Sequence, residues 1–181
     1  RAEVYVGKPA VAYRETIMRS ASFDYTFKRQ VGSSLQYARV IGRLESCAEP
    51  FLFENQASAE AIPPQFISAC EQGCRDAVKT GWLKGYPIVG VKVVLEGGSF
   101  HPLESSEMAF RYAARQGFEQ GFAQANPTIL EPMMLLEVET ASEFLGRIQG
   151  KLLSRRALLL GSETRDNDDV AIRAEVPLAE M

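Results

Sequence analysis

His101 is the only histidine in the chain, and histidine is the residue type best suited to proton transfer near neutral pH. Glu104 and Glu107 follow it closely, so a carboxylate and an imidazole could form an acid–base pair. No G-x-S-x-G elbow and no catalytic-cysteine signature accompanies them. Because spacing of this kind is a weak signal, we expect no catalytic site in this chain.

The other residues with reactive side chains also give little evidence for a metal or cofactor site. Cys47, Cys70 and Cys74 are an odd number for a disulfide framework, and the last two fall four apart in a helical pattern, so we interpret all three as buried thiols. A metal site would need more ligands than these and His101. The chain has no G-x-x-x-x-G-K-[ST] phosphate loop, and EGGS at 96–99 lacks its lysine. We therefore expect no metal and no cofactor here.

Length and charge narrow the function classes further. The chain has 181 residues, 46% of them hydrophobic, which suits one ordinary domain or two small ones. It contains no membrane-length apolar run and no secretory signal, so we expect a soluble, cytoplasmic protein that makes no membrane contact, and nothing suggests an oligomer. A net charge of −3 argues against a DNA binder or any globally basic surface. An RNA contact would have to be local.

These side chains must be positioned by the elements around them. Runs of β-branched and aromatic residues at 11–17, 23–30 and 35–44 predict an antiparallel sheet. Pro63 and Pro64 suit the opening of a helix that ends near Gly81 and Gly85. Residues 88–95 predict a buried strand, and 96–99 predict the turn that leaves it.

A second helix is predicted after His101. Ser105 or Ser106 can cap its start, an aromatic stripe recurs every fourth residue from Phe110 to Phe122, and Asn126-Pro127 stops it. Prolines 127 and 132 flank a predicted connector, which places a domain boundary near residue 128.

Beyond this boundary the pattern predicts a β-α-β-β unit. A strand begins at Met134, Thr140 and Glu143 form a possible capping box, and strands at 157–161 and 170–176 follow the helix. A ferredoxin-like domain would need one more helix and strand. We therefore expect the second domain to be truncated and less ordered than residues 63–125.

Four stretches in order along the chain resemble elongation factor G, a translational GTPase family. They are residues 63–112 (PPQFISACEQ…AFRY), 6–17 (VGKPAVAYRETI), 130–156 (LEPMMLLEVE…LLSRR) and 172–181 (IRAEVPLAEM). The resemblance implies domain IV at 1–128 and a truncated domain V at 129–181. It implies an α+β fold: a domain IV of the ribosomal protein S5 domain 2-like type, with two helices on one side of a sheet and a left-handed βαβ crossover, then a partial ferredoxin-like domain V.

The resemblance also implies a function. Such a chain is the ribosome-contacting arm of a factor that promotes GTP-dependent translocation of tRNA and mRNA, by inserting its tip at the decoding region of the small subunit. Its partners would be rRNA, tRNA, mRNA and the N-terminal domains of the same protein, as a monomer. GTP and Mg would belong to a G domain that this chain lacks.

Two loops would form that tip, 27–40 and 97–106. The resemblance places His101 at the family's tip histidine, Gln30 and Gln36 at its glutamines, and Gly32 at a loop glycine. The remaining candidate contacts with tRNA, mRNA or rRNA are Lys28, Arg29, Ser33, Ser34, Gly98 and Ser99. Imidazole and amide groups can bond to 2′-hydroxyls and phosphates without reading sequence.

Each candidate also has a purely structural interpretation. His101 could hydrogen-bond the N-terminus of the following helix, and Lys28 and Arg29 could be a solvated strand end. Phe100 and Tyr37 suit the core of a sheet.

The first loop departs from the family pattern, since Ser33, Ser34 and Leu35 replace two glycines and an arginine. If these positions need positive φ, the loop must take another path. A paralogue specialised in ribosome recycling therefore stays open, as does a small-molecule enzyme on the same fold.

Overall fold

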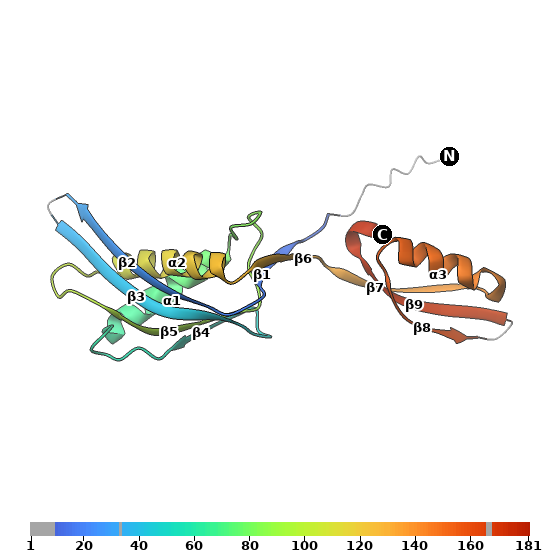
Figure 1. The fold of residues 1–181 in the computed structure, drawn as a ribbon, viewed down its shortest axis with the longest axis horizontal. Helices are drawn as coiled ribbons and strands as arrows, with labels where there is room; N and C mark the ends of the chain where they lie inside the picture. Colours follow the sequence, from blue (N-terminus) through green and yellow to red (C-terminus); the bar gives the residue numbers. More distant parts are fainter. Residues whose placement is uncertain (1–9, 33, 166–167) are drawn as a thin grey trace, which may run out of the picture. The chain divides into compact units, whose positions relative to one another are not determined.

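A computed structural model describes residues 10–32, 34–165 and 168–181 (Figure 1). Contacts within the chain divide it into two compact units, one over Arg14–Leu130 and one that contains Glu131–Met181. No helix in the described ranges is both long enough and apolar enough to cross a bilayer.

The larger unit is built on a four-stranded sheet of order β2-β3-β5-β4. Its strands are β2 (Ala21–Val31), β3 (Ser34–Ser46), β4 (Phe51–Asn55) and β5 (Val91–Ser99). β3 lies antiparallel to both β2 and β5, whereas β4 runs parallel to β5. The antiparallel pairing predicted for 23–30 and 35–44 is confirmed, whereas the run predicted at 11–17 contributes its strand to a separate sheet. β4 was not predicted.

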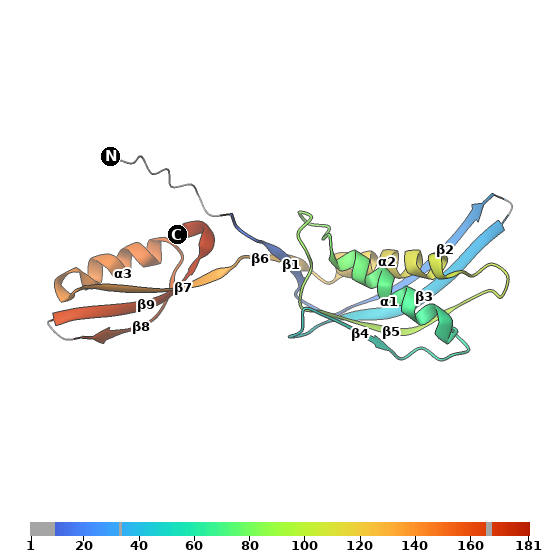
Figure 2. The ribbon, with the colours of Figure 1, turned by 180° about the vertical axis from the view of Figure 1, so that it is seen from behind.

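Two helices, α1 (Pro64–Val78) and α2 (Glu107–Gln124), cover one face of this sheet (Figures 1 and 2). Glycines make the close packing possible: a Cβ on Gly73 of α1 would lie 2.2 Å from the carbonyl oxygen of Arg111. Phe66 stacks on Phe110 between the helices, with ring centroids 4.7 Å apart. The two-helix layer predicted for this domain is confirmed.

A short second sheet joins the beginning and the end of the larger unit. β1 (Arg14–Ile17) pairs antiparallel with β6 (Pro127–Leu130). The interpretation of this last segment as a connector is therefore wrong. Proline is tolerated as the first residue of a strand, and Pro127 occupies that position.

The segment 96–99 is not the turn that its composition predicted. β5 continues through it to Ser99, and the register against β3 shifts between Ile41 and Gly42, so that Glu96 is the extra residue of a bulge. A Cβ on Gly98 would lie 2.1 Å from the carbonyl oxygen of Arg39. Gly98 thus allows β3 and β5 to approach each other closely.

The smaller unit has the predicted β-α-β-β order. It contains β7 (Met133–Ala141), α3 (Leu145–Ser154), β8 (Leu158–Thr164) and β9 (Asp169–Pro177), with single 3-10 turns at Ser142–Phe144 and Leu178–Glu180. Its antiparallel sheet has the order β7-β9-β8. The capping box is wrong, because Thr140 stays in β7 and no side chain caps the turn or the helix.

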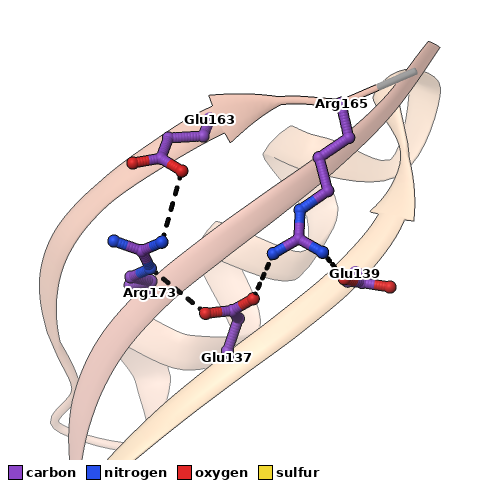
Figure 3. A network of polar contacts seen from close by, with 5 residues as sticks. All are labelled: Glu137, Glu139, Glu163, Arg165 and Arg173. Atoms are coloured by element: carbon purple, nitrogen blue, oxygen red, sulfur yellow. Dashed lines mark hydrogen bonds and ion pairs between the residues drawn. The ribbon is translucent and has the colours of Figure 1, made fainter.

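Ion pairs cross the exposed face of this small sheet (Figure 3). Arg165 binds Glu137, at 2.5 Å, and Glu139, while Arg173 binds Glu137 at 3.1 Å and Glu163 at 3.2 Å. These side chains are 40–65% exposed, so the network stabilises the unit only modestly.

The cysteines divide into two kinds. Cys70 and Cys74 are buried in the core of the larger unit, and burial raises the pKa of the Cys70 thiol to about 12 and that of Cys74 further. Such thiols are inert at neutral pH. Cys47 is only partly buried, so its assignment as a buried thiol is wrong.

Candidate nucleic-acid interface

The β2–β3 hairpin and the loop at 100–106 lie at the same end of the larger unit (Figures 1 and 2). Val31 pairs with Ser34 to close the hairpin, and β5 ends at Ser99 opposite Arg39, further down the same β3 strand. The two loops proposed from the resemblance therefore flank one segment of β3.

Hydrogen bonds attach the second loop to that segment. The backbone N–H of Tyr37 donates to the carbonyl of Glu104 at 2.9 Å, and the Ser105 hydroxyl donates to the carbonyl of Tyr37 at 2.6 Å. The Tyr37 and Ser99 hydroxyls lie 2.7 Å apart and share one hydrogen bond. These contacts fix the loop relative to the sheet.

His101 sits at the start of this fixed loop with 48% of its side chain exposed. Its backbone N–H donates to the Ser105 hydroxyl at 2.9 Å, and its carbonyl accepts from the N–H groups of Glu104 and Ser105. Its Nδ1 accepts from the N–H of Leu103 at 3.4 Å. The backbone is thus fixed, and the imidazole faces solvent with Nε2 free of partners among the described residues.

His101 does not cap the following helix. That task falls to Ser106, whose hydroxyl accepts from the N–H of Ala109 at 3.1 Å, as one of the two predicted caps. The alternative interpretation, in which His101 hydrogen-bonds the N-terminus of this helix, is therefore wrong.

The hairpin turn contains Gly32 at φ 63°, a backbone conformation that glycine adopts without strain. Leu35 lies in β3 opposite Gln30, and its φ is not positive. Leucine therefore causes no left-handed strain here. Ser33 lies outside the described residues, and Ser34 is described only by its backbone.

Lys28, Arg29 and Gln30 are exposed near the end of β2, and neither cation has an ion-pair partner among the described residues. Arg39, further down β3, is instead bound to Asp24 at 2.6 Å, and this hydrogen bond lowers the pKa of the Asp24 carboxyl. Unneutralised positive charge is therefore concentrated towards the hairpin turn.

Gln36, Gly98 and Ser99 contribute chiefly to the scaffold. The Gln36 side-chain oxygen accepts from the Ser106 hydroxyl at 2.6 Å, and Ser99 is bound to Tyr37. Gly98 lies against the β3 backbone. Much of the hydrogen-bonding capacity of Gln36 and Ser99 is already used within the chain. The contribution of all three residues to a nucleic-acid interface stays a prediction.

Two residues of this end were not among the predicted contacts. Ser105, one of the two candidate caps, instead accepts from the His101 N–H and donates to the Tyr37 carbonyl, which joins the loop to β3. Leu103 is 91% exposed beside His101, and a single leucine in a loop gives no signal of its own.

Comparison with known proteins places both units in one family. The family model described as elongation factor G, domain IV, matches residues 9–126, and that described as elongation factor G C-terminus matches residues 128–181.

Individual relatives agree. "Elongation factor G 1" of Syntrophus aciditrophicus (strain SB) is 48% identical over 99% of this chain and 26% of its own length. "Elongation factor G 2" of Anaeromyxobacter dehalogenans (strain 2CP-C) is 46% identical over 98% of the chain and 26% of its own length. A crystal structure from Thermus thermophilus is similar with a TM-score of 0.81 and 38% identity, over 96% of this chain and 26% of that one. The chain spans about a quarter of these proteins.

Proposed function

This chain belongs to the elongation factor G family, and we propose that it is the arm by which such a factor contacts the ribosome during GTP-dependent translocation of tRNA and mRNA. Its tip would enter the decoding region of the small subunit. GTP and Mg would act in a part of the cytoplasmic, monomeric full-length protein outside this chain.

The observation that carries the proposal is the convergence of two loops at one end of a packed body. The hairpin presents Lys28, Arg29 and Gln30, and the hydrogen-bonded loop beside it presents the His101 imidazole. A rigid mount matters because binding then orders few side chains and loses little conformational entropy.

These groups suit contacts that must work for every codon. An imidazole can donate, accept and stack, and a glutamine amide can bond to a 2′-hydroxyl or a phosphate oxygen. Lys28 and Arg29 add charge complementary to a phosphate backbone. None of these interactions requires a particular base.

The proposed action is mechanical. The arm would occupy the space vacated by a moving tRNA and so disfavour its return. Such an arm shifts the equilibrium only by the difference in its affinity for the two ribosomal states, which is why tip contacts matter.

Substitution of His101 by alanine in a full-length factor that carries this chain tests the proposal. We expect slower single-round translocation, because one tip contact is lost. Ribosome-stimulated GTP hydrolysis should stay nearly intact, because the variant leaves the remote nucleotide site unaltered. Both rates can be measured by rapid mixing on the same ribosomes.

Gln124→Ala provides a matched control, since Gln124 is an exposed polar residue at the opposite end of α2. This variant should translocate at the unmodified rate. Equal translocation rates for His101→Ala and Gln124→Ala would contradict the assigned tip.

A further inference from the structure

A second surface runs along the first half of α2, beside the tip. Three hollows there share Met108, with volumes of about 190, 320 and 450 Å³. The smallest is also lined by Arg29 and Gln36 of the hairpin. We call the exposed side chains of Arg29, Met108, Arg111, Tyr112 and Arg115 the α2 flank.

The centre of the α2 flank is apolar. Met108 is 71% exposed and Tyr112 is 44% exposed, one helical turn apart on the same side of α2. Phe27 of β2 supports the tyrosine, with ring centroids 4.8 Å apart at an angle of 50°. An aromatic ring is thus fixed from behind while much of it stays open to solvent.

Exposed arginine side chains flank this centre. Arg29 and Arg115 are exposed and have no ion-pair partner among the described residues. Arg111 is already bound to Asp76, which Lys79 also binds at 2.8 Å. Carboxylates are also present: Glu107 lines the hollow on the α1 side and Asp76 lines the hollow that contains Arg115, whereas the hollow that contains Arg29 has no acidic lining residue.

We propose that the α2 flank binds a single-stranded RNA segment, with a base stacked on Tyr112 beside Met108 and phosphates near Arg29 and Arg115. Guanidinium groups around an exposed aromatic ring are the combination that single-strand binders use. The choice of RNA as partner rests on the proposed function. The α2 flank lies outside the loop that carries His101. The bound RNA segment would run from the β2–β3 hairpin along α2.

Binding of this chain to a fluorescently labelled oligouridine tests the proposal, measured by anisotropy at several salt concentrations. Tyr112→Ala should weaken binding about 5- to 150-fold, the contribution of one stacked base, without changing the salt dependence. Arg115→Gln should lower the slope of log affinity against log salt by about 0.7, the value for one phosphate contact on a single strand.

One further variant covers the case in which Tyr112→Ala does not fold, and another is a control for the removal of an arginine. Tyr112→Leu retains packing against Phe27 but removes the aromatic face, so it should weaken RNA binding even if Tyr112→Ala does not fold. Arg147→Gln removes an exposed arginine from α3 of the smaller unit and should leave both affinity and slope unchanged.

Three results would overturn the proposal: no RNA binding by the unmodified chain, flank variants that bind like the Arg147→Gln control, or equally tight binding to polyglutamate. The outcome is separable from that for the tip. If His101→Ala translocates normally while the flank variants lose RNA affinity, the proposed function fails and the flank site stands.

Discussion

Among individual residues, Glu15 shows how a buried charge organises a loop. It lies in β1 with no exposed surface, and its carboxylate accepts from the backbone N–H groups of Leu83, Lys84 and Tyr86 at 2.8–3.2 Å. A buried carboxylate is tolerated when donors surround it in this way. The loop between α1 and β5 is therefore folded around one side chain from a distant strand.

Glu15→Ala should destabilise the larger unit by about 2–4 kcal/mol, because buried N–H groups would lose their acceptor. Urea unfolding followed by Trp82 fluorescence measures this directly. Trp82 is the only tryptophan, lies within this loop and packs on Phe118 and Phe122.

The exposed Glu60 serves as the control, and Glu60→Ala should change stability by less than about 0.5 kcal/mol. Equal unfolding midpoints for the two variants would show that the carboxylate does not hold the loop.

Residue-level prediction succeeded where the signal was local. The Ser106 cap follows from serine before an apolar helical stripe. The burial of Glu15 and the contact between Gln36 and Ser106 join residues about 70 positions apart. No local pattern encodes such pairs, so the sequence could not reveal them.

Among the elements, the long strands and helices were predictable because their periodicity repeats over many residues. β4 and β6 are only five and four residues long, and each depends on a distant partner strand for its pairing. The prediction of a turn at 96–99 is wrong because glycine pairs, although typical of turns, also occur where strands approach closely. Here the pair follows a bulge and permits close strand packing.

Gly98→Ala should destabilise the larger unit by about 1–3 kcal/mol, because a methyl group 2.1 Å from the Arg39 carbonyl oxygen forces β3 and β5 apart. The same fluorescence-detected unfolding measures the loss.

Its neighbour provides a close control. A Cβ on Gly97 meets nothing within 4 Å, so Gly97→Ala should be neutral or slightly stabilising. If both alanines cost the same, backbone freedom rather than strand contact explains the glycines.

At the scale of the whole molecule, the two units differ in the size of their cores. The larger buries a continuous cluster from both helices and the sheet, whereas in the described part of the smaller the buried cluster consists of Leu152, Ala157, Val170, Ile172, Ala174 and Val176. Burial of apolar surface is the main source of stability, so the units should open independently and unequally.

Hydrogen exchange measured by mass spectrometry should therefore show amides of 131–181 exchanging faster than those of 63–125. Exchange of both ranges at one rate would contradict separate stabilities. Exposed loops of the larger unit should be excluded from the comparison, since their amides exchange without any opening.

The edge of the larger sheet has a consequence for crowded solutions. Among the described residues, β2 pairs in the sheet with β3 alone, and the N–H of Asp24 donates to the Gln120 side chain of α2 at 3.3 Å. An incoming strand from another copy would have to displace that amide and approach the exposed Lys28 and Arg29. The fold thereby discourages self-polymerisation through its longest accessible strand edge.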